Sequence, residues 1–257
     1  MTALVTGAGA RLGRAMALYL ADRGHDVAVH YATSADGAEE VATAIRAKGR
    51  QAVTLQADLL NEDQTQSLVD QAVDALGPLN VLVNNASIFE YDNIASATRS
   101  SWDRHMDSNL RAPFVLTQHF ARQVPDPAID PQGEPVAQGL IVNMLDQRVR
   151  KLTPEFATYT LAKMGLWALT RTAAQGLAPR VRVNGIGPGP TLQGARQSAD
   201  HFSRQRAATV LQRGADPDGI CAALGYLLDA KAVTGQMIAV DGGQHLAWQT
   251  PDVLGVE

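Results

Sequence analysis

The sequence predicts an α/β fold: a single Rossmann-type doubly wound domain with a seven-stranded parallel sheet and helices on both faces. Short apolar runs alternate with amphipathic stretches along all 257 residues. The amphipathic stretches are long enough to be the crossover helices that parallel strands require, and such crossovers cover both faces of a sheet. No Ser/Gly-rich linker or change of composition divides the chain, so residues 1–257 are expected to form one domain.

The elements follow one another in strict alternation. Seven apolar runs are expected as strands: Ala3 to Thr6, Val27 to His30, Ala52 to Gln56, Val81 to Asn84, Gly139 to Met144, Arg182 to Ile186 and Gln236 to Val240. Six stretches between them are expected as helices: Leu12 to Arg23, Ala38 to Lys48, Gln64 to Ala75, Ser101 to Gln123, Thr158 to Leu177 and Asp218 to Leu228.

Two segments interrupt this alternation. Residues 124–138 contain four prolines and are expected to form a surface loop. Residues 191–216 are polar and Arg-rich, and they follow a strand at its carboxyl end, where ligands bind in such sheets. This second segment is expected to be a mobile substrate loop or lid, and the alternative is a solvated excursion without function.

Composition excludes several classes of protein. The net charge is −4 and the Lys and Arg residues are scattered, which argues against a nucleic-acid partner. Cys221 is the only cysteine, so the chain can form neither an internal disulfide nor a Cys-based metal site. The first residues enter a strand directly, and no apolar run approaches the length of a membrane span. We therefore expect a soluble, unprocessed cytoplasmic protein that binds no metal.

A glycine-rich turn follows the first expected strand. Gly7, Gly9 and Gly13 would let the backbone approach a pyrophosphate at the N-terminus of the next helix. Their spacing is one residue longer than the commonest dinucleotide fingerprint, and a turn without a ligand is the alternative.

Tyr159 and Lys163 are four residues apart in an expected helix and therefore share one face. An ammonium beside a phenol favours the phenolate, so we expect Lys163 to lower the pKa of Tyr159. Asn85, Asn109 and Asp146 are expected at the same edge of the sheet. Together these groups form a candidate site for proton transfer.

The whole set resembles the short-chain dehydrogenase/reductase superfamily over nearly the full chain. The residues that carry the resemblance are Gly7 to Gly13, Asp58, Asn84-Asn85-Ala86, Asn109, Tyr159, Lys163, Pro188-Gly189 and Asp241-Gly242-Gly243. The resemblance implies that Tyr159 is the general acid, that Lys163 holds the nicotinamide ribose, and that Asn109 anchors a proton-relay water. It further assigns cofactor contacts to Gly7, Gly9, Arg11, Leu12, Gly13, Asp58, Leu59, Asn85, Ala86, Ser87, Tyr159, Lys163, Pro188, Gly189 and Thr191. Relatives commonly form homotetramers through helices at the positions of Ser101 to Gln123 and Thr158 to Leu177.

Asp146 departs from the superfamily pattern, which has a serine thirteen residues before the tyrosine. One explanation is a degenerate enzyme, and the other is a subfamily that uses the carboxyl group. Because a carboxylate and a phenolate repel each other, one of the two should hold a proton.

The pteridine reductases and dihydromonapterin reductases are such a subfamily, and this chain resembles them at Arg11, Ser87 and Phe89 as well. The resemblance implies that Phe89 stacks on a pterin, that Arg11 contacts cofactor phosphate and substrate, and that Ser87 contacts both ligands. The expected substrate contacts are Arg11, Ser87, Phe89, Asp146 and Tyr159. The alternatives are a core or lid aromatic at Phe89 and a solvated charge at Arg11.

The end of the second strand favours NADPH over NAD. An enzyme selective for NAD would carry an acidic residue there, and none occurs before Asp36. The candidates to surround a 2′-phosphate are Arg11, His30 and Ser34. The subfamily often has an arginine at the position of Thr33, so the phosphate contact here would be weaker.

Three functions are compatible with these residues. The first is an NADPH-dependent reductase of a pterin or dihydropterin. The second keeps the hydride chemistry and changes the substrate to a ketone, an aldehyde or an acyl thioester. The third is a non-catalytic NADP-binding protein, against which the intact Tyr159 and Lys163 argue.

Overall fold

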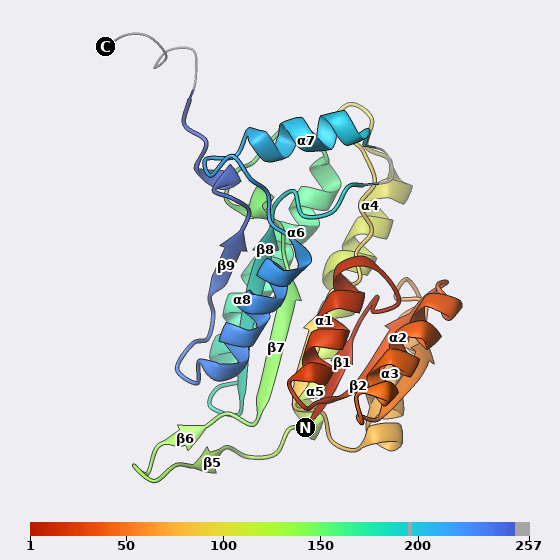
Figure 1. The fold of residues 1–257 in the computed structure, drawn as a ribbon, viewed down its shortest axis with the longest axis vertical. Coiled ribbons are helices and arrows are strands. Elements are labelled where there is room, and N and C mark those ends of the chain that lie inside the picture. The colour runs from red at the N-terminus through yellow and green to blue at the C-terminus, as the bar shows by residue number, and fades with distance from the viewer. Residues whose placement is uncertain (195–196, 250–257) are drawn as a thin grey trace.

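The central sheet has seven parallel strands, as the sequence predicts (Figure 1). The structure is a computed structural model that describes residues 1–194 and 197–249. The strands are β1 (Thr2–Val5), β2 (Asp26–Tyr31), β3 (Ala52–Gln56), β4 (Val81–Asn84), β7 (Gly139–Met144), β8 (Val181–Pro188) and β9 (Met237–Val240). Their order is β3-β2-β1-β4-β7-β8-β9. The winding direction changes between β1 and β4, so the carboxyl ends of these two strands border the crevice where ligands bind in such sheets.

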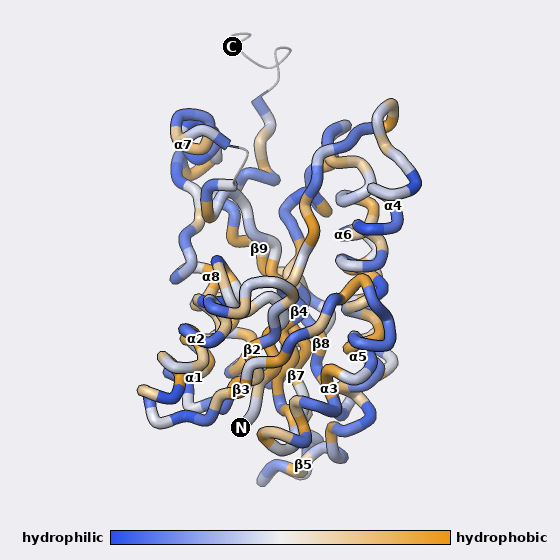
Figure 2. Tube along the Cα trace, turned by 90° about the vertical axis from the view of Figure 1, so that its right-hand side faces the viewer, coloured by the Kyte–Doolittle hydropathy of each residue, from blue (hydrophilic) through white to orange (hydrophobic). Residues whose placement is uncertain are grey.

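Helices cover both faces of the sheet, and Figure 2 shows the apolar strands between them. The helices are α1 (Arg11–Asp22), α2 (Ala35–Ala47), α3 (Glu62–Leu76), α4 (Arg99–Met106), α5 (Ala112–Gln123), α6 (Ala157–Gly176), α7 (Ala199–Ala207) and α8 (Pro217–Asp229). Met16, Ile45 and Leu224 belong to the core on one face, beneath α1, α2 and α8. Leu68, Phe120 and Ala174 belong to the core on the other face, beneath α3, α5 and α6. The strands are therefore buried from both sides, as their continuous apolar runs require.

The expected helix Ser101 to Gln123 is interrupted. Between α4 and α5 the backbone forms a π-helical turn, Asp107–Arg111, which contains Asn109. A π turn inserts one residue into the helical repeat and often occurs at functional sites. It turns Asn109 inward, where the side chain is fully buried.

The Pro-rich segment is an exposed excursion, as expected, but it contains a short antiparallel hairpin of β5 (Ala128–Ile129) and β6 (Pro135–Val136). The hairpin extends from the end of the sheet opposite α7 (Figure 1).

The segment 191–216 contains helix α7, which the sequence did not predict. Ser198 caps this helix through a hydrogen bond from the His201 N–H. No residue of the helix is buried, so it lacks the apolar stripe by which helices are predicted. Residues 195 and 196 of the expected lid lie outside the described residues.

Within residues 1–194 and 197–249, no helix is long and apolar enough to cross a membrane. Over the same ranges, no three His, Cys, Asp or Glu side chains are grouped so that they could hold a metal ion.

Candidate active site

The glycine-rich turn joins β1 to α1 and is tight enough for its backbone to approach a pyrophosphate closely. Gly7 has a φ of +62°, which favours glycine. A Cβ atom at Gly13 would lie 2.1 Å from the Gly7 carbonyl oxygen, so only glycine fits there. The N-cap residue of α1, Ala10, has no side chain to bond the first N–H groups, and the first turn carries no acidic residue. This end of the helix suits an anion.

His30 holds the glycine-rich turn from beneath. Its Nδ1 atom accepts a hydrogen bond from the Gly7 N–H over 3.0 Å, so the Nε2–H donates to the Ala57 carbonyl, also over 3.0 Å. Burial lowers the pKa of His30 to about 4, so the ring is neutral. The side chain is 1% exposed and both nitrogens are bonded inside the protein. The expectation that His30 contacts a 2′-phosphate is therefore wrong for this arrangement.

Thr6 ties the turn to the end of β4. Its hydroxyl accepts hydrogen bonds from the N–H groups of Asn85 and Ala86 over 2.9 and 3.0 Å. The Asn85 side chain donates back to the Thr6 carbonyl over 2.8 Å. The two expected cofactor segments thus form one bonded unit at the switch point of the sheet.

Arg11 spans the crevice. Its guanidinium donates to the backbone carbonyls of Leu192 and Gln193, in the segment that follows β8. The residue itself begins α1 with a φ of +51°. Arg11 therefore lies between the glycine-rich turn and the loop after β8, as a residue that contacts both cofactor and substrate would.

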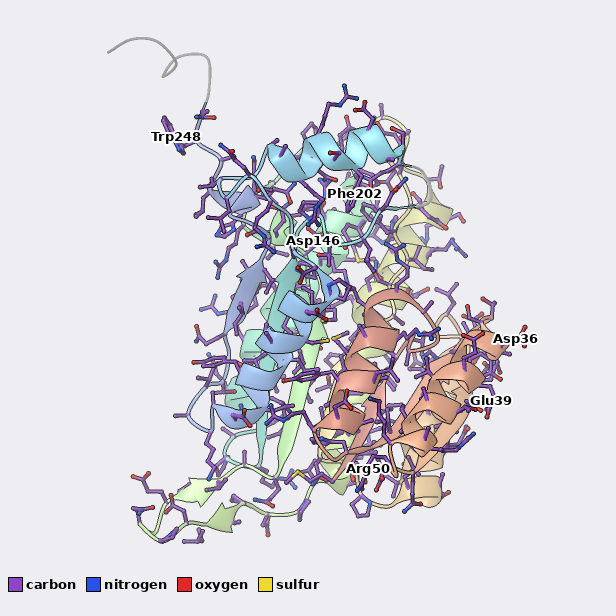
Figure 3. The ribbon with its side chains drawn as sticks, viewed as in Figure 1. Asp36, Glu39, Arg50, Asp146, Phe202 and Trp248 are labelled. Carbon is purple, nitrogen blue, oxygen red and sulfur yellow. The ribbon has the colours of Figure 1, made fainter. Side chains whose placement is uncertain are left out.

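Asp146 and Tyr159 are in direct contact. The Tyr159 hydroxyl donates to Asp146 Oδ2 over 3.0 Å, and the Arg148 N–H donates to Asp146 Oδ1 over 2.8 Å. Burial raises the pKa of Asp146. Burial and the neighbouring carboxylate raise the pKa of Tyr159 well above its usual value, although a hydrogen bond with Ser87 opposes this. The pair therefore retains a proton, as the sequence argument requires. In Figure 3, Asp146 lies at the upper end of the sheet, below α7.

Lys163 lies on the same face of α6 as Tyr159, with its Nζ 5.6 Å from the centre of the phenol ring. The ammonium donates to the Met144 carbonyl over 2.7 Å, and burial lowers its pKa to about 8. The charge of Lys163 does not offset the rise in the Tyr159 pKa that burial and the charge of Asp146 cause. The expected lowering of the Tyr159 pKa is thus not found in this structure.

Asn109 shapes the wall of the site. Its amide nitrogen donates to the Ile88 carbonyl over 2.8 Å, and its Oδ1 accepts from the Ile88 N–H over 3.0 Å. The side chain thereby fixes the segment that carries Ser87 and Phe89. That Asn109 also anchors a relay water stays a prediction.

Phe89 is 46% exposed and belongs to an aromatic cluster. Its ring stacks on Phe156, with the centroids 4.3 Å apart and the planes 12° from parallel, and meets Tyr159 edge to face at 4.7 Å. Phe156 is not marked by any motif in the sequence, although its position three residues before Tyr159 places it at the start of the same helix. Phe156 has a φ of +58°, and its N–H donates to the Asp92 carbonyl over 2.7 Å.

A buried network that the sequence does not predict lies behind Tyr159. Asp92 accepts hydrogen bonds from both the N–H and the hydroxyl of Thr158, in the first turn of α6. His105 bonds the same hydroxyl through Nδ1 over 2.6 Å, and its ring lies 5.9 Å from that of Tyr159. The network fixes the start of the helix that carries Tyr159 and Lys163. Neither Asp92 nor His105 occurs in a motif that marks it in the sequence.

The remaining expected cofactor residues lie along the carboxyl edge of the sheet. Ser34 and Asp58 are exposed after β2 and β3, and Leu59 is buried beside Asp58. Gly189 follows β8, and a Cβ atom there would lie 2.6 Å from Asp241. The other members are Leu12, Ala86, Pro188 and Thr191. Their distribution from β3 to β8 matches an extended ligand that crosses the switch point.

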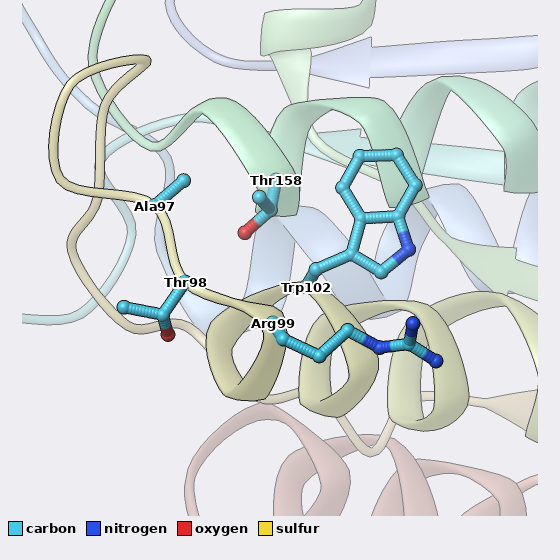
Figure 4. A pocket seen from close by; sticks show the side chains of 5 residues that line it. All are labelled: Ala97, Thr98, Arg99, Trp102 and Thr158. Carbon is cyan, nitrogen blue, oxygen red and sulfur yellow. The ribbon is translucent and has the colours of Figure 1, made fainter.

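An open hollow of about 350 Å³ lies between the starts of α4 and α6. Figure 4 shows the side chains that line it. It is lined by Ala97, Thr98, Arg99, Trp102 and Thr158. Of these, Arg99 is charged, and it is paired with Asp103. Neither Asp146 nor Tyr159 lines the hollow, although Thr158 precedes Tyr159 in α6.

Comparisons with known proteins agree with this geometry. A family model described as enoyl-(acyl carrier protein) reductase matches residues 7–245. The 3-oxoacyl-(acyl-carrier-protein) reductase FabG of Staphylococcus epidermidis is 33% identical over 95% of this chain and 99% of its own.

Solved structures are similar over almost the whole chain. The FolM alternative dihydrofolate reductase 1 of Brucella suis, in complex with NADP, is 44% identical, with a TM-score of 0.91 and 98% of both chains covered. A blue fluorescent protein from a metagenomic library, in complex with NADPH, is 31% identical, with a TM-score of 0.85, covering 95% of this chain and 97% of its own. The chain belongs to the short-chain dehydrogenase/reductase family.

Proposed function

We propose that this protein is an NADPH-dependent reductase of a pterin or dihydropterin, with Tyr159 as the proton donor, aided by Asp146 and Lys163. The observation that carries the proposal is the hydrogen bond from the Tyr159 hydroxyl to Asp146 Oδ2, beside the partly exposed ring of Phe89. A proton donor next to an aromatic surface suits a flat heterocycle whose ring nitrogen must be protonated.

The cofactor is NADP(H), with which the solved relatives are in complex. The turn from Gly7 to Gly13 and the uncapped start of α1 fit its pyrophosphate, because they offer N–H groups without a competing side chain. When bound, NADPH supplies the hydride. Arg11 and Ser34 remain the candidates for its 2′-phosphate.

The protein's own part in the reaction is to hold and deliver a proton. Since burial raises the pKa of both Asp146 and Tyr159, a proton stays between them at neutral pH. Tyr159 donates it to the substrate, and a proton taken up from solvent by the Asp146 carboxylate is passed on to restore the phenol. We propose that Lys163 exchanges its bond to the Met144 carbonyl for one to the ribose, which would bring its charge closer to the phenol.

The substrate class rests on three residues. Asp146 stands at the position of the superfamily serine, Phe89 offers an aromatic surface, and Ser87 lies close enough to Tyr159 to lower its pKa. Two relatives named as alternative dihydrofolate reductases, 44% and 43% identical to this chain, support the same class.

The second candidate function is reduction of a carbonyl, such as a 3-oxoacyl thioester. It is favoured by the 33% identity to 3-oxoacyl-(acyl-carrier-protein) reductases and by the enoyl-(acyl carrier protein) reductase family model. Against it stands the carboxyl group at position 146, because a carboxylate near a carbonyl oxygen that becomes negative is unfavourable.

Steady-state kinetics with NADPH on two substrate panels test the proposal. One panel holds dihydrobiopterin, dihydromonapterin and dihydrofolate, and the other holds ketones, aldehydes and an acetoacetyl thioester. We expect kcat/KM to be larger for the best pterin. A larger kcat/KM on the carbonyl panel would select the second function, and NADPH binding without turnover on either panel would select a non-catalytic protein.

We further propose that the protein is a homo-oligomer, a tetramer by resemblance. In the single chain, three large apolar side chains on neighbouring helices are exposed: Trp102 on α4 (44%), Phe114 on α5 (38%) and Leu161 on α6 (48%). A second subunit that covers this helical face would bury them. Sedimentation equilibrium tests this. A single domain and a cytoplasmic location stay predictions.

A further inference from the structure

Arg148 lies beside the Asp146–Tyr159 pair, and nothing above gives its side chain a role. It follows Asp146 by two residues, and its backbone N–H donates to Asp146 Oδ1 over 2.8 Å. The start of the side chain is therefore fixed close to the carboxyl group. The side chain is partly exposed.

The guanidinium continues the aromatic cluster as its third layer. Its Cζ atom lies 4.9 Å from the centre of the Phe156 ring. Because Phe89 stacks on one face of Phe156 at 4.3 Å, Arg148 must cover the other face. The order is thus Phe89, Phe156, Arg148, leading from the expected ring-binding surface to a positive charge.

The orientation of the guanidinium is held, and its charge acts on Asp146 and Tyr159 without forming an ion pair. Nη1 donates to the Thr153 hydroxyl and to the Glu155 carbonyl. Among residues 1–194 and 197–249, no carboxylate forms an ion pair with Arg148, and its Nε and Nη2 atoms have no acceptor. Other arginines of the chain are paired, such as Arg104 with Glu90 and Arg111 with Glu62. An arginine that is oriented by stacking and keeps two free donors is suited to bind a carboxylate.

Neighbouring cations do not share this arrangement. Arg150 donates to the Met237 carbonyl and faces His245, on the side of β9. Lys151 lies three residues beyond Arg148 in the same loop and is only partly exposed. It therefore offers a matched control for the removal of one positive charge.

We propose that Arg148 is a specificity-determining residue that binds a carboxylate on the substrate's side chain, so that the preferred substrate is a pterin with an anionic tail. The inference rests on the proposed pterin reduction and narrows its substrate class. The pterin ring would lie against Phe89, and its side chain would pass Phe156 toward the guanidinium.

The test compares dihydrofolate, which carries carboxylates, with dihydrobiopterin, which carries none. The enzymes are wild type, Arg148→Gln, Arg148→Lys and Lys151→Gln. Since a hydrogen bond to a charged group contributes about 1.5–3 kcal/mol, we expect Arg148→Gln to lower kcat/KM for dihydrofolate by tenfold or more, through KM. The KM of dihydrobiopterin should change by less than about twofold, which is far below the effect of a lost charged hydrogen bond. A change in kcat shared by both substrates would report the loss of a positive charge near Asp146 and Tyr159. Arg148→Lys should restore part of the loss, and Lys151→Gln should leave both substrates unchanged.

Binding without turnover gives the second measurement. The Kd of folate and of biopterin for the enzyme loaded with NADP⁺ should show the same selective loss in Arg148→Gln. Equal losses for both ligands would mean that Arg148 only supports the site, and no loss for either would mean that it binds no substrate; both results overturn the inference. If wild type reduces neither pterin, the proposed function fails, and these Kd values still decide the role of Arg148.

Discussion

Tyr159 donates a hydrogen bond to Asp146 over 3.0 Å, where most members of the family place a serine next to the tyrosine. The two groups differ in what they can contribute. A serine hydroxyl orients the substrate, whereas a carboxyl group whose pKa is raised by burial can also accept a proton and pass it on. The pair is thus better suited to a substrate that must be protonated on a ring nitrogen than to a simple ketone.

The Tyr159→Phe variant tests the proton donor. Removing the hydroxyl should abolish reduction, while the Kd of NADPH should change little because one hydroxyl is a small part of a cofactor site that extends along the sheet edge. Stopped-flow kinetics and NADPH fluorescence measure the two quantities. Substantial residual turnover would mean that another group delivers the proton.

The Asp146→Ser variant tests the carboxyl group. It should lower kcat/KM for a pterin by 10²-fold or more, which is the usual contribution of a general acid. Carbonyl reduction should fall much less, because serine is the ordinary residue of carbonyl reductases in this family. Asp146→Asn serves as the isosteric control, since it keeps the size of the side chain and removes the titrating proton. Equal effects on both substrates would contradict the proposed role.

The His30→Gln variant tests the buried imidazole beneath the glycine-rich turn. The folded-state pKa of His30 is about 4, below the unfolded value of 6.5, so between these values the unfolded chain binds a proton that the folded chain does not. The free energy of unfolding should therefore decrease as the pH falls below 6.5, by about 2 kcal/mol at pH 5. Urea denaturation at pH 7.5 and pH 5 measures how far the free energy of unfolding falls between the two pH values. In His30→Gln this fall should be smaller than in wild type by about 2 kcal/mol. The exposed His201→Gln variant should behave like wild type, and an unchanged decrease in His30→Gln would contradict the assignment.

The Thr6→Val variant tests the link between the turn and β4. It removes an acceptor of two part-buried N–H groups, of which the Asn85 N–H also donates to the Val83 carbonyl, and should lower the free energy of unfolding by about 1–3 kcal/mol. Thr172, an exposed residue whose hydroxyl bonds its own helix, provides the control as Thr172→Val. A loss below about 1 kcal/mol would mean that water replaces the hydroxyl, since one ordinary hydrogen bond contributes that much.

Much of the fold could be predicted from the sequence, because each strand is an apolar run buried on both faces. Helix α7 could not be predicted, because its polar side chains form no periodic apolar stripe. Its hydrogen bonds to the rest of the protein, such as those of Arg206 to the Pro190 and Ala215 carbonyls, depend on the folded structure. The π-helical turn at Asp107–Arg111 was also missed, since one inserted residue does not disturb the local pattern of apolar positions.

The site was predictable where a motif fixes the residues, as for Tyr159, Lys163 and Asp146. It was not predictable where a residue's role depends on the direction in which its side chain points. His30 ends a strand, and a side chain there can face the crevice or the interior; its bonds to Gly7 and Ala57 turn it inward. Phe156 and Arg148 were missed because their role depends on stacking between residues far apart in the sequence.

The structure of a ternary complex with NADP⁺ and dihydrofolate tests the central claim most directly. We predict that the pteridine ring lies parallel to the ring of Phe89, between it and the nicotinamide, with a ring nitrogen within hydrogen-bonding distance of the Tyr159 hydroxyl or the Asp146 carboxyl. A pteridine ring bound away from Phe89, with neither group in contact, would contradict the assignment of this protein as a pterin reductase.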